Sequence, residues 1–251
     1  MESKARFSSR VENYIRYWPG YPPQVIALLQ EKCGLTAQSR VVDVGSGTGS
    51  LARLSLALGC PLTGVEPNPE MRAVGERLLA AYPNFTSRAG SAEDTGLPTA
   101  CADIITAGQA FHWFDMEATR AEFARILRPG GWLVIVWNER RVNTSPFLAE
   151  YERLLHAYSL DYKAVDHRRF DPAAVQAFVG NSPVHHAAFE NLQLFDLAGL
   201  VGRALSSSYV PEAGQPNHEA MLAGLHDIFD HYQQGGQVVF AYDTRVYYAQ
   251  W

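Results

Sequence analysis

The sequence predicts an α/β fold in which alternating strands and helices form a doubly wound, mostly parallel sheet. Between residues 40 and 139, short apolar or β-branched runs alternate with stretches of helical spacing. Such alternation is typical of βαβ units, whose parallel strands are joined by helices. A strand-like run at the C-terminus, residues 238–251, predicts an antiparallel strand that completes this sheet.

The elements of the first half are expected in a regular order. Strands are predicted at 40–45, 61–67, 85–90, 101–108 and 131–138. The last run is almost continuously apolar, as in a strand buried on both faces. Helices are predicted at 48–59, 68–82 and 116–131. The second of these begins with Asn68 as N-cap and Pro69 at its first position, and the third ends in a Pro-Gly-Gly turn.

The pattern changes after residue 139. Polar helical stretches occupy 140–180, most clearly 147–158, and an alternating outer strand is predicted at 189–196. Two more helices are expected at 198–208 and 218–233. We therefore predict three segments. Residues 1–139 form a core with an N-terminal lid segment, 140–236 form a helical insertion and outer strand on the substrate side, and 237–251 form the last strand of the core sheet.

Composition narrows the function classes. The chain has 251 residues and a formal net charge of -5, so nothing predicts a nucleic-acid or membrane partner. Its three cysteines lie far apart, and its histidines show no spacing of a metal set, so neither disulfides nor a metal site is predicted. The N-terminus lacks an apolar signal segment, and the default expectation is a cytoplasmic monomer or homodimer.

The stretch VVDVGSGTGS places Gly45, Gly47 and Gly49 between the first strand and its helix. Such a loop lets a nucleotide-like ligand approach the backbone closely; the alternative is a tight turn without a ligand. A dinucleotide fingerprint is G-x-G-x-x-G, but the third glycine comes one residue early and Ser50 takes its place. The Asp43 charge would repel a pyrophosphate and suits a cationic ligand. Glu66, after the second strand, can accept two ribose hydroxyls. This pattern favours S-adenosylmethionine over NAD.

Five motifs resemble, in order, those of class I S-adenosylmethionine-dependent methyltransferases. They are VVDVGSGTGSL, GVEPNPEM, GSAEDTGLP, CADIITAGQAFHWFD and LRPGGWLVIV, and they span residues 40–138. Two flanking stretches, YIRYWPGYP and the tail LSSSYVPEAG with VVFAYDTRVYY, are similar to the small-molecule, trans-aconitate methyltransferase-like group. The resemblance implies a Rossmann-like fold with S-adenosylmethionine as cofactor.

The resemblance also implies a role for each matching position. The loop Gly45, Ser46, Gly47, Thr48 and Gly49 would pass under the methionine and ribose parts, with Asp43 orienting bound groups. Glu66 would bind the ribose hydroxyls, Pro67 and Met71 would pack on the adenine, and Ala92 and Glu93 would lie at its edge. Gln109 would lie near the methionine part.

Three N-terminal residues, Arg16, Tyr17 and Tyr21, are expected to close over the cofactor, and both tyrosines are also candidates for substrate contact. Arg16 would pair the cofactor's carboxylate; the alternative is a solvated surface arginine. For Glu93, the alternative is a carboxylate favoured by a helix N-terminus.

The acceptor side is predicted at the end of the fourth strand. Methyl transfer is an in-line displacement and needs a protein base only when the acceptor must lose a proton. His112 is the candidate catalytic and substrate-binding residue, as a base, as an orienting donor, or merely as a packed ring. Of the three aromatic residues Phe111, Trp113 and Phe114, one or two are predicted in the core and one is predicted to face the acceptor pocket.

Two further substrate candidates follow the fifth strand. Trp137 is a pocket or a core aromatic. Arg140, beside Arg141, would bind an acidic acceptor or remain solvated. The predicted function is methyl transfer from S-adenosylmethionine to a small-molecule acceptor. The alternatives are an NAD-dependent oxidoreductase and a protein that binds the cofactor or its product without catalysis.

Overall fold

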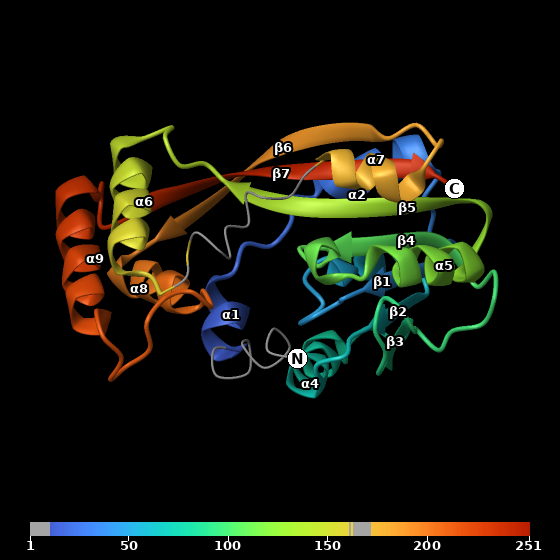
Figure 1. The fold of residues 1–251 in the computed structure, drawn as a ribbon, viewed down its shortest axis with the longest axis horizontal. Coiled ribbons are helices and arrows are strands. Elements are labelled where there is room, and N and C mark those ends of the chain that lie inside the picture. Colours follow the sequence, from blue (N-terminus) through green and yellow to red (C-terminus); the bar gives the residue numbers. More distant parts are fainter. Residues whose placement is uncertain (1–10, 161, 163–171) are drawn as a thin grey trace. The chain divides into compact units, whose positions relative to one another are not determined.

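A computed structural model describes residues 11–160, 162 and 172–251 (Figure 1). The chain forms two compact units. Unit 1 comprises Met1–Pro19, Glu139–Arg169 and Glu190–Asp243, and unit 2 comprises Gly20–Asn138, Phe170–Phe189 and Thr244–Trp251. The three segment boundaries expected from the sequence remain a prediction.

The sheet has seven strands in the order β3-β2-β1-β4-β5-β7-β6. The strands are β1 (Val41–Val44), β2 (Leu62–Val65), β3 (Phe85–Arg88), β4 (Ala102–Gly108), β5 (Leu127–Arg140), β6 (His185–Phe195) and β7 (Val238–Gln250). The first five pair in parallel, with Val41 opposite both Leu62 and Ile104. The predicted α/β class with a mostly parallel sheet is confirmed.

The C-terminal strand runs antiparallel to β5. The Gly130 N–H donates to the Trp251 carbonyl, whereas the Arg141 N–H donates to the Ala241 carbonyl, so residue numbers rise along β5 as they fall along β7. Ring contacts show the same relation between β6 and β7, because His185 stacks on Tyr248 and Phe195 meets Phe240. The predicted antiparallel last strand is thus present.

Helices cover both faces of the unit 2 sheet. They are α2 (Gln24–Cys33), α3 (Ala52–Leu58), α4 (Pro69–Leu79), α5 (Met116–Ile126) and α7 (Pro172–Val179). Alternate residues of each strand point to opposite faces. Ile105 and Leu133 accordingly join the core under α5 and α7, whereas Ile104 and Val134 join the core under α2, α3 and α4. The sheet is therefore doubly wound.

Unit 1 has a core of its own. Its helices are α1 (Val11–Tyr17), α6 (Pro146–Tyr158), α8 (Leu197–Leu205) and α9 (His218–Tyr232). The fully buried ring of Phe240 on β7 packs edge-on against Phe147, Tyr151 and Phe195. This aromatic cluster joins the helices to the strand ends within the unit.

A local sequence signal explains where α4 starts. The Asn68 side chain accepts from the N–H groups of Glu70 and Met71, as its predicted N-cap role requires. The predicted helix 116–131 is wrong at its C-terminus, because α5 ends at Ile126. The Pro-Gly-Gly run belongs to β5, whose Gly130 and Gly131 pair with Trp251.

Within the described residues, no helix is long and apolar enough to cross a membrane. The same residues contain no group of three or more His, Cys, Asp or Glu side chains placed to hold a metal ion. His167 lies outside the described residues.

Candidate functional site

The polar residues singled out from the sequence gather at one edge of the unit 2 sheet. The glycine loop follows β1, Glu66 follows β2 and Gln109 follows β4. Strand β1 lies between β2 and β4, so the chain continues from β1 to one side and later returns to the other side of it. Ligands of doubly wound sheets bind at such a switch point.

The glycine loop is packed too closely for side chains at two positions. Gly45 has a φ of +67°, and an added Cβ would lie 2.6 Å from the Ala110 Cβ. Gly49 has a φ of +83°, and its Cβ would lie 2.5 Å from Leu79 Cδ1. The loop backbone therefore rests on the segment after β4 on one side and on α4 on the other.

The rest of the loop is held by backbone hydrogen bonds. The N–H groups of Gly45 and Ser46 both donate to the carbonyl of Val65, at the end of β2. The Thr48 side chain is buried, with its hydroxyl 3.4 Å from that of Ser50. At Gly47, by contrast, a Cβ would meet only the Met71 methyl, at 3.6 Å. The loop is thus shaped by contacts within the chain.

Glu66 ties the loop to the next helix. Its buried carboxylate accepts from the Gly47 N–H through Oε2, at 2.9 Å, and from the Asn68 N–H through Oε1, at 2.8 Å. An ionised carboxylate offers about four lone-pair sites. The two backbone donors therefore fix this carboxylate between the glycine loop and the start of α4.

Asp43 lies inside β1 and is only 1% exposed. Burial and, to a smaller extent, the charge of Glu66 raise the pKa of its carboxyl, and the Thr106 hydroxyl, which donates to Oδ1 at 2.6 Å, lowers it. The net result is a pKa of about 7. None of the described groups that shift this pKa is basic. Two neighbouring acidic side chains make a site that favours a positively charged ligand.

Asp43→Asn is expected to flatten the dependence of stability on pH. In the unfolded chain the carboxyl ionises near 3.8, whereas the folded protein keeps its proton up to about pH 7. The folded state binds more protons in that window, so the free energy of unfolding falls as pH rises from about 4 to 7. The pKa rise corresponds to about 4 kcal/mol. About 3 kcal/mol of this loss falls between pH 5 and pH 8, and urea unfolding at these two pH values should show it in the wild type but not in the variant.

The exposed Asp94 provides the control for that measurement. Asp94→Asn should retain the wild-type dependence on pH. An Asp43→Asn variant that loses as much stability as the wild type between pH 5 and pH 8 would contradict a buried, protonated Asp43.

The adenine-side candidates lie around the same edge. Met71 is buried in the first turn of α4 and Pro67 is half-buried before it. Ala92 is buried in the core under α5 and α7. The Glu93 carboxylate accepts from the N–H of Asp115, the N-cap of α5, at 3.0 Å. Glu93 therefore stands at a helix N-terminus, and its role toward a cofactor remains a prediction.

Gln109 has a strained backbone and a fixed side chain. Its φ is +54°, which is uncommon outside glycine and clusters at functional sites. Its Oε1 accepts from the Asn138 N–H, at the carboxyl-terminal part of β5. Within the described chain no acceptor is recorded for its Nε2, so that donor remains for a ligand.

Sequence reasoning missed Asn138 and Thr106. Asn138 donates through Nδ2 to the Gly20 carbonyl at 3.1 Å and accepts the Thr244 hydroxyl through Oδ1. It therefore connects the segment before α2 to β5 and β7. Both missed residues are polar side chains inside otherwise apolar strands, and this was the available signal.

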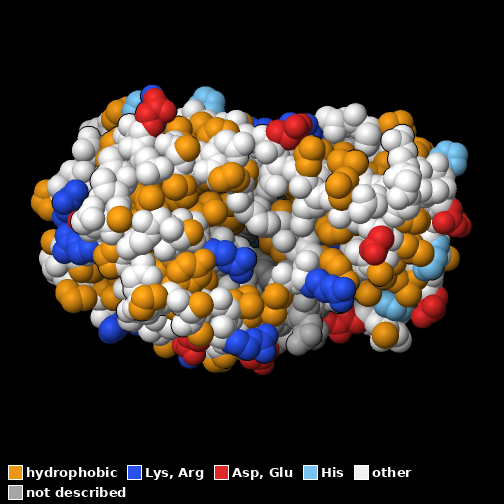
Figure 2. All heavy atoms as spheres, turned by 180° about the vertical axis from the view of Figure 1, so that it is seen from behind, with side chains coloured by type: hydrophobic (Ala, Val, Ile, Leu, Met, Phe, Trp, Pro, Cys, Tyr) orange, Lys and Arg blue, Asp and Glu red, His pale blue; other side chains and the backbone are white. Residues whose placement is uncertain are grey.

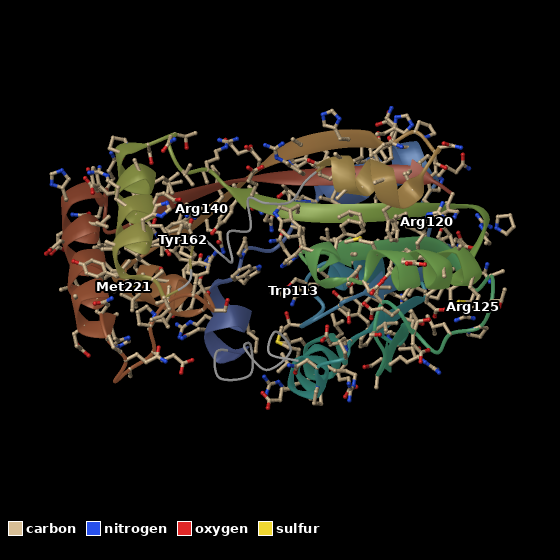
Figure 3. The ribbon with its side chains drawn as sticks, in the orientation of Figure 1. Trp113, Arg120, Arg125, Arg140, Tyr162 and Met221 are labelled. Carbon is tan, nitrogen blue, oxygen red and sulfur yellow. The ribbon has the colours of Figure 1, made fainter. Side chains whose placement is uncertain are left out.

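The aromatic residues after β4 form a short 3₁₀ turn, Phe111–Trp113, which points some of their side chains to the core and others to solvent. Phe111 is buried, whereas His112 is exposed and Trp113 is 43% exposed (Figure 3). The centre of the His112 ring lies 4.4 Å from the ring centre of Trp113 and 5.0 Å from that of Trp137, and Trp137 is buried. Trp137 thus supports the histidine from the core.

Tyr21 is the N-terminal residue that belongs to unit 2. Its hydroxyl lies over Gly108, where an added Cβ would approach to 2.6 Å. Tyr21 therefore covers the end of β4, directly before Gln109.

The other three candidates belong to unit 1. Arg16 is exposed, and its guanidinium lies 5.3 Å from the Tyr17 ring centre. The Tyr17 ring packs on Gly202 and on Phe195. Arg140 is held in an ion pair with Glu152. Their roles toward cofactor and substrate remain predictions.

On the face shown in Figure 2, Lys and Arg side chains are dispersed among neutral ones. That distribution fits the net charge of -5 and offers no broad basic surface for nucleic acid on this face.

The fold is that of a Rossmann-like α/β protein, and the candidate site lies at its β1–β4 switch point. Residues 42–135 match the family described as a methyltransferase domain. An uncharacterised methyltransferase of Mycobacterium tuberculosis (strain H37Rv) is 40% identical over 134 residues, which are 53% of this chain and 52% of that protein. One of Schizosaccharomyces pombe is 31% identical over 59% of this chain and 58% of that protein. The chain thus spans about half the length of the curated relatives it matches.

Solved structures agree on the fold. A protein of Anaeromyxobacter dehalogenans, provisionally named a type II methyltransferase, superimposes with a TM-score of 0.66 at 22% identity, over 92% of this chain and 96% of that one. Phosphoethanolamine N-methyltransferase 2 of Haemonchus contortus gives a TM-score of 0.56 at 15% identity, over 97% of this chain and 57% of that one. At these identities the likeness establishes a shared fold.

Proposed function

We propose that the chain is an S-adenosylmethionine-dependent methyltransferase that transfers the methyl group to a small-molecule acceptor. The observation that carries this proposal is the pair of neighbouring acids, Asp43 and Glu66, beside a glycine loop at the switch point. Their charge disfavours the pyrophosphate of NAD and suits a ligand with a sulfonium and an ammonium group. The methyltransferase-domain match over residues 42–135 supports the same activity, and the Haemonchus protein is described in complex with S-adenosylhomocysteine.

The described residues fit this cofactor. The Glu66 carboxylate, held beside the glycine loop, accepts the ribose hydroxyls, and the open face of Gly47 next to Met71 admits the nucleoside. Gln109 directs its amide toward the methionine part. Asp43 supplies negative charge beside the bound cofactor, because a nearby cation lowers the pKa of a carboxyl and favours its ionised form. When bound, S-adenosylmethionine supplies an activated methyl group on a sulfonium. The likeness to the trans-aconitate methyltransferase-like group rests on the flanking motifs and remains a prediction.

The chain's own contribution to the chemistry is orientation. The 3₁₀ turn after β4 presents His112 and Trp113 to solvent at the same strand end as Gln109. An exposed imidazole supported by Trp137 can take a proton from a hydroxyl or an acidic carbon, or donate a hydrogen bond to a carboxylate acceptor. We assign His112 to the acceptor.

His112→Ala is expected to lower kcat by about 100-fold, the lower end of the effect of a general base. Its affinity for S-adenosylhomocysteine should stay within about threefold of the wild type, a difference under 1 kcal/mol. Turnover is followed as S-adenosylhomocysteine released with the best acceptor from a panel of small molecules. The exposed His226 on α9 is the control, and His226→Ala should leave kcat unchanged. Unchanged turnover in His112→Ala would give that ring a packing role only.

Isothermal titration calorimetry tests the proposed function. The folded protein should bind S-adenosylhomocysteine with a dissociation constant below about 100 μM and should give no heat with NADH. Absence of binding to S-adenosylhomocysteine would overturn the proposal, and binding of NADH alone would favour an oxidoreductase. Binding without methyl transfer to any acceptor would favour a non-catalytic binding protein.

A further inference from the structure

Unit 1 contains two arginines whose side chains are almost completely removed from solvent. Arg203 lies on α8 and is 5% exposed, and the side chain of Arg140, at the end of β5, is 11% exposed. Burying a guanidinium is costly unless an anion compensates its charge. The partners of each therefore indicate whether that compensation is complete.

Arg140 is only partly compensated. Its Nη2 donates to Glu152 and, at 2.9 Å, to the hydroxyl of Tyr162, which lies beside it (Figure 3). The same carboxylate accepts the Tyr162 hydroxyl at 2.8 Å and lies 3.2 Å from His156 Nε2. Arg140 thus shares this carboxylate with the Tyr162 hydroxyl. Nη1 of Arg140 is buried and has no acceptor among the residues described.

Arg203 has no carboxylate partner in the described part of the chain. Its Nε donates to the Tyr242 hydroxyl at 3.1 Å, and its Nη1 donates to the hydroxyls of Ser206 and Ser207 at 3.3 and 3.0 Å. Its guanidinium lies 4.4 Å from the centre of the Trp18 ring. All these partners are neutral, and no acceptor for Nη2 is recorded among the described residues.

The two guanidinium groups act on the same buried hydroxyl. Burial raises the pKa of Tyr151, whereas Arg203 and Arg140 both lower it. Arg140 also lies 5.1 Å from the centre of the Tyr151 ring. The tyrosines that the two arginines contact, Tyr151, Tyr162 and Tyr242, belong to one buried core. Among the residues described, the two arginines and Glu152 therefore form one cluster at this core, with two positive charges and one negative charge.

We propose that this cluster binds the oxyanion of a small ligand, a carboxylate or a phosphate, within unit 1. Arg203 would receive it through Nη2 and Arg140 through Nη1. The planar fork of a guanidinium matches two oxygens of either group, which a lysine cannot reproduce. A bound oxyanion supplies the negative charge that the cluster lacks. The inference concerns unit 1 alone and stands whether or not unit 2 binds S-adenosylmethionine.

The test uses the full-length protein labelled with ¹⁵N, without S-adenosylmethionine, at constant ionic strength. Potassium phosphate and sodium malonate are titrated separately while the arginine Nε–H signals are recorded. We expect at least one anion to shift the Arg203 signal along a saturable curve. Saturation by phosphate alone would assign a phosphate ligand, and saturation by malonate alone would assign a carboxylate.

Variants separate binding from general anion effects. Arg203→Lys keeps the charge but loses the fork, so the affinity measured on the Arg140 signal should fall at least tenfold. Arg153→Met is the control, because Arg153 lies on α6 with its side chain 69% exposed, and it should bind as the wild type does. No saturable shift with either anion in the wild type would overturn the proposal. Equal affinity in wild type and Arg203→Lys would also overturn it.

Discussion

Glu66→Ala is expected to weaken the binding of S-adenosylhomocysteine by at least about 100-fold. Hydrogen bonds to a charged group contribute about 1.5–3 kcal/mol each, and the proposed function assigns two ribose hydroxyls to this carboxylate. Two such bonds correspond to about two orders of magnitude in affinity. The variant also removes the acceptor of the Gly47 and Asn68 N–H groups, which loosens the loop. Calorimetry on the folded variant measures the loss.

Two further variants make that result specific. Glu66→Gln retains an acceptor for a backbone N–H but loses the charge, so its affinity should fall by about tenfold, or 1.4 kcal/mol. Glu70, exposed in the first turn of α4, is a nearby carboxylate without a role in the site, and Glu70→Ala should bind normally. Wild-type affinity in Glu66→Ala would exclude Glu66 from the ribose.

Gly45→Ala is expected to destabilise the protein far more than Gly34→Ala. The two glycines have nearly the same backbone conformation, with φ values of +67° and +65°. An alanine at Gly34 meets nothing within 4 Å, so only the strain of about 1–2 kcal/mol remains. At Gly45 the Cβ would lie 2.6 Å from the Ala110 Cβ, which adds about 1–3 kcal/mol of overpacking. Urea unfolding of both variants gives the comparison.

The same pair allows a rescue. Because Ala110 provides the clashing atom, the double variant Gly45→Ala, Ala110→Gly should recover the overpacking part of the loss and part of the affinity for S-adenosylhomocysteine. Equal costs for Gly45→Ala and Gly34→Ala would mean that the loop after β1 does not rest on Ala110.

Most of the sheet could be predicted because its signals are local. The alternation of apolar runs and helical stretches located β1 to β4 and α4, and Asn68 with Pro69 marked a helix start. Pairing between strands that are far apart in the sequence could not be predicted from such local signals. The run 127–131 joins β5 because Gly130 and Gly131 pair with Trp251, more than a hundred residues away. Helix α2, Gln24–Cys33, was missed because the N-terminal segment was interpreted only as a cover for the cofactor.

The candidate site, too, could be predicted from the sequence only in part. Motif order located the glycine loop, Glu66 and Gln109 at strand ends, because a parallel sheet brings such ends together. The partners of these residues could not be inferred. Asp43 reaches Thr106 only because β1 and β4 are neighbours in register. Likewise, the sequence predicts that Arg140 binds an acidic acceptor or remains solvated. The solvated alternative is wrong, because the side chain is buried in the ion pair with Glu152, which chain order alone does not reveal.

A crystal structure of the protein with S-adenosylhomocysteine tests the central claim most directly. The account predicts both ribose hydroxyls within hydrogen-bonding distance of the Glu66 carboxylate. It also predicts the nucleoside against Gly47 and Met71, and the amino acid part beside Asp43 and Gln109. A ligand bound elsewhere, or a ribose that makes no contact with Glu66, would contradict the assignment of this site.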